Sequence, residues 1–326
     1  MKGKQLCGIA LASVLILSGC SSTVQENGKD VLASIDGKNV LADDVYTSLS
    51  SSKSGQTALF NYVLEKLVNE KFPINDDMKE NASQIVENIE ANYKSQYGDE
   101  AQTQLESALA SGGYKDIEAY EESLIQSLQY SEFVKKYVKD NFDKVYDDYY
   151  KQESPRIMSI IKVAMNDVEN PTNEEKEKLK EIQNLLKTNK SFADIATSYS
   201  DDSSKNAKGN IGVVDSTLGL TNKYGENVEK SALSLKEGKV SQSIKGTDGY
   251  YFLYCVSTDK AKIKEELKNV DIDSPLLAYD NYLMYFAFNS YKLTYKDNNI
   301  KKQIESIVNE ALKAREEERG KAKWKN

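Results

Sequence analysis

The sequence predicts an α+β protein in which a mixed middle third is flanked by mostly helical segments. Between Arg156 and Ser257, short β-rich runs alternate with stretches whose apolar residues recur at helical spacing. The expected order there is strand, helix, helix, strand, helix, strand, strand, which is typical of one compact domain. On either side of this stretch, the apolar residues keep a helical spacing almost throughout.

Residues 31–153 are expected to be helical after one short hairpin. Val31–Ile35 alternates like a strand, and Asp36-Gly37 predicts a tight turn. Asp43 or Asp44 is expected to cap the next helix. Further helices are predicted up to Phe72-Pro73, over residues 76–97, and from residue 117 past residue 138.

Residues 154–259 are expected to form the mixed domain, and residues 260–326 return to helices. Arg156–Ala164 is rich in β-branched residues, and Asn170-Pro171-Thr172 is typical of a helix start. A second helix is predicted to start at Ser191, and a third over residues 227–235. The remaining strands are predicted at residues 211–214, 240–246 and 250–257.

The first twenty residues read as a secretory signal. Lys2 and Lys4 precede an uncharged run from Leu6 to Leu17 that is too short to cross a bilayer as a helix. Leu17-Ser18-Gly19-Cys20 is similar to a bacterial lipobox, in which the cysteine is acylated. We expect a signal peptide over residues 1–19, lipid on Cys20, and a polar tether over residues 20–30. The mature chain would then be anchored on the extracytoplasmic face of a bacterial membrane.

The composition excludes several classes of function. Forty-three basic residues oppose 51 acidic ones, so we expect no nucleic-acid partner. The chain has no histidine, which excludes Ser-His-Asp triads and Cys-His dyads. With Cys7 in the signal and Cys20 acylated, Cys255 is left without a disulfide partner. No cofactor and no metal is expected.

The middle segment resembles a parvulin peptidyl-prolyl isomerase domain. The resemblance rests on motifs that occur in the family's order: Ser191-Phe192-Ala193-Asp194-Ile195-Ala196, Tyr199-Ser200-Asp201, Gly209-Asn210-Ile211-Gly212, Ser231-Ala232-Leu233-Ser234-Leu235, Lys236-Glu237-Gly238-Lys239-Val240-Ser241 and Gly249-Tyr250. With the lipobox and the helical flanks, the whole chain resembles PrsA-type foldase lipoproteins. That resemblance implies a parvulin-like domain inserted into a helical chaperone domain similar to SurA.

The resemblance also implies where a site would lie. Parvulins carry two histidines on adjacent central strands, and these positions are occupied here by Ile160 and Tyr251. The facing acidic residue corresponds to Asp202, and the apolar cup for the proline ring to Tyr224, Val228 and Leu233. Asp202 and Tyr251 are therefore the candidate catalytic residues, and Ile160 joins the three cup residues as candidate substrate contacts.

Each of these residues also has an ordinary structural interpretation. Ile160 and Tyr251 are typical of core packing on a strand, and Asp202 is typical of a helix or turn cap. Cys255 is typical of a small buried side chain.

Three functions therefore stay open. The first is a prolyl isomerase that assists the folding of secreted proteins, and the second is a non-catalytic holdase with a degenerate parvulin domain. The third, a solute-binding lipoprotein, would show alternating β-α units in two lobes. We expect unfolded secreted proteins as partners, weak or undetectable turnover and intact chaperone activity. The sequence leaves open whether two copies form a homodimer through the helical segments.

Overall fold

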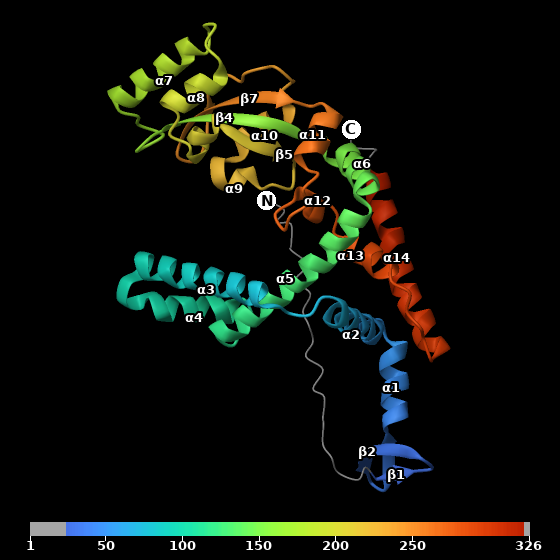
Figure 1. The fold of residues 1–326 in the computed structure, drawn as a ribbon. Coiled ribbons are helices and arrows are strands. Elements are labelled where there is room, and N and C mark those ends of the chain that lie inside the picture. The colour runs from blue at the N-terminus through green and yellow to red at the C-terminus, as the bar shows by residue number, and fades with distance from the viewer. Residues whose placement is uncertain (1–23, 323–326) are drawn as a thin grey trace. The chain divides into compact units, whose positions relative to one another are not determined.

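Two long antiparallel strands organise the middle of the chain. The computed structural model describes residues 24–322, and within it β4 (Arg156–Ala164) pairs with β7 (Gly249–Ser257). The short strands β5 (Asn210–Val214) and β6 (Ile244–Lys245) complete a sheet of order β5-β4-β7-β6. Together with its helices, this sheet confirms the predicted α+β class (Figure 1).

Helices cover both faces of this sheet, because successive strand residues point to opposite sides. One face buries Ile160, Tyr251 and Leu253 under α9 (Leu220–Tyr224) and α10 (Glu226–Ser234). The opposite face buries Ile161, Val163 and Phe252 under α7 (Asn173–Leu185) and α8 (Phe192–Tyr199). The first face is the one that borders the candidate site.

The predicted strand over residues 240–246 is shorter than expected. Only Ile244–Lys245 pairs as a strand, while Val240 forms a single bridge with Tyr254. The backbone N–H of Leu253 donates to the side-chain oxygen of Ser241 at 2.9 Å instead of to a backbone carbonyl. This side-chain acceptor interrupts the ladder between the two segments.

The chain divides into two compact units. One comprises the chain up to Phe133 together with residues from Tyr282 onward, and the other comprises Val134–Asn281. Besides the sheet, the second unit contains α6 (Phe142–Glu153), α11 (Lys260–Glu266) and α12 (Pro275–Ala278). The predicted boundaries at residues 154 and 260 stay predictions.

Helices from both ends of the chain build the first unit. Phe60 is 1% exposed and packs against Phe288 and Tyr285, with ring centroids 4.9 and 5.3 Å apart. Lys53 and Glu310 form an ion pair that also joins the N-terminal and C-terminal segments. The helices are α1 (Ala42–Ser51), α2 (Lys53–Lys71), α3 (Asp76–Tyr97), α4 (Ala101–Ser111), α5 (Ile117–Asp140, which runs into the second unit), α13 (Leu283–Asn289) and α14 (Asn298–Ala322).

The N-terminal part of the first unit corrects two expectations. Within residues 24–322 the first strand is β1 (Gln25–Glu26) rather than one at residue 31, because Asn27 and Gly28 adopt positive φ and turn the chain into β2 (Lys29–Ile35). The cap of α1 is Leu41, whereas Asp43 and Asp44 lie in its first turn. The predicted signal peptide and Cys20 lie outside the described residues.

Candidate functional site

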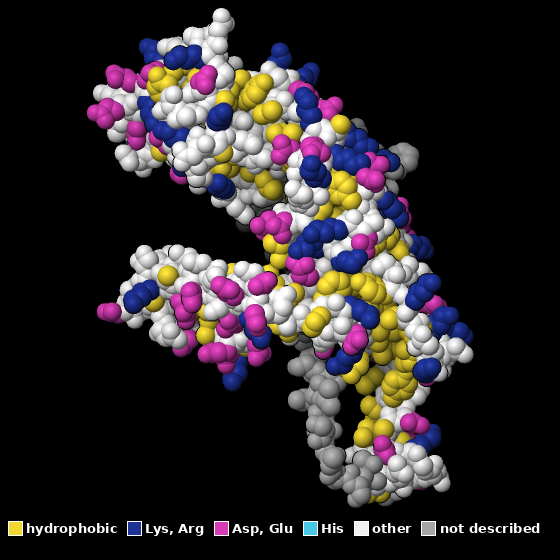
Figure 2. All heavy atoms as spheres, viewed as in Figure 1, with side chains coloured by type: hydrophobic (Ala, Val, Ile, Leu, Met, Phe, Trp, Pro, Cys, Tyr) yellow, Lys and Arg dark blue, Asp and Glu magenta, His cyan; other side chains and the backbone are white. Residues whose placement is uncertain are grey.

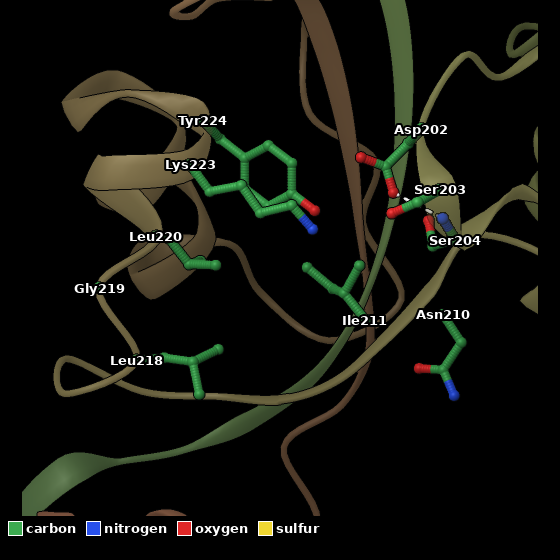
Figure 3. A pocket seen from close by; sticks show the side chains of 10 residues that line it. All are labelled: Asp202, Ser203, Ser204, Asn210, Ile211, Leu218, Gly219, Leu220, Lys223 and Tyr224. Atoms are coloured by element: carbon green, nitrogen blue, oxygen red, sulfur yellow. Dashed lines mark hydrogen bonds between the residues drawn. The ribbon is translucent and has the colours of Figure 1, made fainter. Parts of the chain in front are cut away.

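The candidate site is a pocket of about 430 Å³ beside the first face of the central sheet. Its walls come from α9, from β5, and from the segment that precedes the short 3₁₀ helix η2 (Ser203–Ala207). In Figure 3 the side chains of Asp202 and Tyr224 point from opposite walls into the same space. The site is therefore built by three segments that are separate in sequence.

Asp202 is held in place by its role at the start of η2. Its Oδ1 accepts a hydrogen bond from the backbone N–H of Ser204 at 2.8 Å, and its own N–H donates to Ser200 Oγ at 3.1 Å. The residue is 6% exposed. The turn therefore fixes the carboxylate at the wall of the pocket, so that its capping role and its place in the site coexist.

Tyr224 and Lys223 form the opposite wall. Tyr224 is 3% exposed, and the Lys223 Nζ atom lies 4.8 Å from the centroid of its ring. Burial raises the pKa of Tyr224, and the charge of Asp202 adds to this while Lys223 opposes it. A hydrogen bond with Tyr224 raises the pKa of Lys223. The pocket thus presents a neutral phenol, an ammonium group and a carboxyl group.

Of the six residues predicted for the site, only Asp202 and Tyr224 line this pocket. Of the other four, Ile160, Val228 and Tyr251 belong to the buried cluster beneath it, together with Tyr224, and Leu233 is partly buried and packs against this cluster. The rings of Tyr251 and Tyr224 meet edge to face with centroids 5.4 Å apart. The three predicted cup residues, Tyr224, Val228 and Leu233, therefore lie in or against one core cluster, and of these only Tyr224 lines the pocket.

The hydroxyl group of Tyr251 is engaged within the domain. It donates to Asp248 Oδ1, while the ammonium group of Lys162 pairs with the other oxygen of the same carboxylate. Burial, reinforced by the hydrogen bond to Asp248, raises the pKa of Tyr251. Burial opposes ionisation of Asp248, but the hydrogen bonds from Lys162 and Tyr251 outweigh it and lower its pKa. Tyr251 thus stabilises the turn before β7.

Sequence reasoning missed the other polar groups of the pocket. Lys223 directly precedes the predicted cup residue Tyr224, and this adjacency was the available signal. Ser204 lines the pocket, and its Oγ atom is buried with no hydrogen-bond partner among the described residues. Lys223 therefore supplies a hydrogen-bond donor on the wall opposite the carboxylate, whereas the hydroxyl of Ser204 is buried at the wall itself. Over residues 24–322, His, Cys, Asp and Glu side chains form no group of three or more suited to a metal ion.

The arrangement suits binding of an uncharged, partly apolar segment of polypeptide. Leu218, Leu220 and Ile211 supply the apolar part of the lining. The ammonium group of Lys223 can donate a hydrogen bond to a backbone carbonyl oxygen of a bound peptide. Rotation about a prolyl bond needs no covalent intermediate.

None of the helices within residues 24–322 combines the length and the apolar character needed to span a membrane.

Comparison with known proteins gives a consistent result. The family model described as a rotamase, or PPIC-type PPIase domain, matches residues 157–257. Foldase protein PrsA of Staphylococcus epidermidis is 28% identical over 314 residues, covering 91% of this chain and 89% of the relative. The PrsA protein of Staphylococcus aureus strain Newman is 26% identical over 306 residues, covering 91% and 90%.

Among solved structures, PrsA from Bacillus subtilis shares 22% identity, with a TM-score of 0.39, and 85% of this chain and 98% of that chain are covered. PrsA from Streptococcus pneumoniae shares 23% identity, with a TM-score of 0.38 and the same coverage. The family model covers the middle domain, and the two relatives extend the similarity to 91% of the chain. The chain therefore carries a PPIC-type peptidyl-prolyl isomerase domain and is similar over most of its length to the PrsA foldases.

Proposed function

We propose that this foldase binds proline-containing segments of unfolded secreted proteins at the pocket between Asp202 and Tyr224, and that it isomerises them slowly. The observation that carries the proposal is the pocket itself, where a fixed carboxylate and an apolar wall lie opposite a hydrogen-bond donor, Lys223. The match of the PPIC-type domain supports the same assignment.

The chemistry explains why we expect turnover to be slow. Rotation of a prolyl bond meets a barrier of about 20 kcal/mol, and catalysis requires groups that interact better with the twisted bond than with the planar one. At the two positions where parvulins carry histidine, Ile160 offers no donor, and the hydroxyl of Tyr251 already donates its hydrogen bond to Asp248. Only the ammonium group of Lys223 remains at the pocket wall to stabilise the twisted state.

An isomerase assay on a proline tetrapeptide tests this proposal. We expect a low rate that Asp202→Asn abolishes, because asparagine keeps the cap of η2 but removes the charge. Asp194→Asn, on the exposed side of α8, is the matched control and should leave the rate unchanged. A rate that survives Asp202→Asn would refute the assignment of the site.

A non-catalytic holdase is the second candidate. It is favoured by the complete burial of Ile160 and Tyr251, which are both 0% exposed and therefore cannot touch a bound peptide without rearrangement. The discriminating result is suppression of client aggregation by the Asp202→Asn chain, with no isomerase activity in the wild type.

We further propose that lipid on Cys20 anchors the protein at the extracytoplasmic face of the cell membrane. The lipobox-like Leu17-Ser18-Gly19-Cys20 supports this. Metabolic labelling with a radioactive fatty acid should mark the wild-type chain and not Cys20→Ala. An unlabelled wild-type chain in the membrane fraction would contradict the proposal.

A homodimer through the helical unit is proposed from its exposed apolar side chains. Leu49 and Tyr46 on α1 are 58% and 47% exposed, and Ile35 and Leu32 on β2 are 64% and 58% exposed. Hydrophobic side chains gather at the surface over α1 and α2 (Figure 2). Light scattering should give twice the monomer mass, and Leu49→Asp should return the chain to monomers.

A further inference from the structure

A second, larger pocket lies on the other side of the same edge of the central domain. Its volume is about 1020 Å³, and its lining is mostly apolar. It is formed where α7 and α8 leave part of the second sheet face uncovered, over Ile157 of β4 and over Tyr254 and Val256 of β7. Such a concave, mainly apolar pocket has the character of a binding site.

Aromatic and aliphatic side chains form the floor of this pocket. The rings of Phe192 and Tyr254 stack with their centroids 5.5 Å apart. Val256 and Val240 are 39% and 38% exposed, so apolar surface faces the opening. Lys208 and Lys262 oppose Glu265 and Glu266 around the pocket, so the charged groups balance. An uncharged apolar side chain therefore suits it better than a charged one.

One short ridge separates the two pockets. The first residues of η2, Ser203 and Ser204, line the candidate prolyl site, whereas Ala207 and Lys208 at its other end line the second pocket. Asn210, which is exposed, lines both. The two pockets therefore lie next to each other along one edge of the domain, with Asn210 between them.

The ridge is rigidly placed by backbone contacts. Gly209 has a φ of +78°, and its N–H donates to the carbonyl of Ser204 at 2.9 Å. A Cβ atom on Gly209 would lie 2.7 Å from the carbonyl oxygen of Ile160. The spacing of the two pockets is consequently fixed by the fold.

We propose that the second pocket is a side-chain subsite of the same peptide groove, taking an aromatic or aliphatic side chain of the client segment whose proline occupies the first pocket. This inference rests on the proposed function of the first pocket. Five residues of 3₁₀ helix in the ridge span about 10 Å. An extended peptide covers that distance in about three residues. The preferred client segment thus carries a large apolar residue about three positions from its proline.

Equilibrium binding of labelled peptides to the full-length chain tests the inference. Each peptide contains one proline in an alanine-rich background, with either phenylalanine or alanine three positions before or after it. In one of the two directions, we expect the phenylalanine peptide to bind about tenfold more tightly, since its ring is removed from water. Val256→Asp should abolish this gain and leave the alanine peptide unaffected. Ile272→Asp, which is 37% exposed and lies outside both pockets, is the matched control.

Equal affinities for the phenylalanine and alanine peptides in both directions would overturn the inference, and so would a gain that survives both Val256→Asp and Val240→Asp. The inference would also be overturned if the wild type showed no preference for the phenylalanine peptide and Val256→Asp halved the mass in light scattering. That result would assign the pocket to a second copy of the chain. Peptides whose proline is replaced by alanine separate the two proposals. If they bind as tightly as the proline peptides, and Val256→Asp still removes the gain in affinity from phenylalanine, the subsite stands and the proposed prolyl function fails.

Discussion

The two sheets of this protein differ in how they are covered. The sheet β5-β4-β7-β6 is buried on both faces, and Ile160, Ile161 and Tyr251 are each 0% exposed. The other sheet consists of β1, β2 and β3 (Lys38–Leu41), and none of the residues in it or in the adjoining α1 is buried. A sheet with its own core can position side chains to a fraction of an ångström, whereas an uncovered sheet cannot. The comparison explains why both pockets lie in the second unit, which contains the covered sheet.

The largest predicted effect tests the rigidity of the central sheet. Gly209→Ala should lower the free energy of unfolding by about 3 kcal/mol, because it combines a positive φ with a backbone clash. Gly238 has a φ of +72°, but no atom lies within 4 Å of an added Cβ. We therefore expect Gly238→Ala to lower the free energy of unfolding by only about 1 kcal/mol. Urea unfolding measures both, and equal losses would contradict the close approach at Gly209.

Removing a buried carboxylate comes next. Asp215 is 0% exposed, and its Oδ2 accepts the hydroxyl of Tyr149 at 2.5 Å while Oδ1 accepts the N–H of Thr217 at 2.7 Å. Asp215→Ala leaves these donors buried without an acceptor and should cost about 2 kcal/mol. Because this carboxylate also fixes the loop that leads to Leu218 in the first pocket, the affinity for proline peptides should fall as well. Unchanged affinity would show that the loop does not depend on Asp215.

Alkaline pH gives a third test. Burial, with the charge of Asp215, raises the pKa of Tyr149 above that of an unfolded tyrosine, near 10. The folded state therefore keeps the proton that the unfolded state loses, so stability is fully present below pH 10 and falls as the pH rises further. Tyr149→Phe should remove a loss that totals about 1.4 kcal/mol between pH 9 and 11 and approaches about 1.4 kcal/mol per pH unit only at higher pH. Urea unfolding between pH 9 and 11 measures it, and an unchanged slope would contradict the assignment.

Introducing histidine at the two strand positions should raise the isomerase rate and lower the stability of the fold. Ile160→His with Tyr251→His places imidazoles where parvulins carry them, and we expect the isomerase rate to rise by about tenfold or more. Burying the polar ring in place of Ile160 should cost about 2 kcal/mol. A variant that folds without any gain in rate would show that further differences in the pocket limit turnover.

The smallest effect is expected in the uncovered sheet. Ile35→Ser and Leu32→Ser should each change the unfolding free energy of the monomer by no more than about 0.5 kcal/mol, because these side chains already lie in water. A larger loss, measured at the lowest protein concentration that gives a signal, would mean that this sheet is covered even in the monomer.

Much of the fold follows from local sequence rules. The helix predicted over residues 76–97 is confirmed as α3, since Asn75 caps it and Gly98 ends it. The mixed middle segment is predictable because its strands and helices differ clearly in period. Asn27-Gly28 is an equally strong hairpin signal, and we missed it by interpreting the polar stretch around it as a tether.

Other elements depend on information that lies far away in the sequence. The strand predicted over residues 240–246 is interrupted because the N–H of Leu253 donates to the side chain of Ser241, 12 residues away. For the site, the family resemblance indicated Asp202 and Tyr224. It did not indicate that Tyr251 donates to Asp248 or that Ser204 lacks a partner, because both facts depend on where loops meet in space.

Refolding of a client whose slow phase is limited by a prolyl bond tests the central claim most directly. Such a phase lasts tens of seconds without catalysis. With one chain per ten clients, the account predicts a higher yield and a slow phase accelerated by no more than about twofold, an acceleration that Asp202→Asn removes. An acceleration of tenfold or more by the wild type, unchanged by Asp202→Asn, would contradict the account.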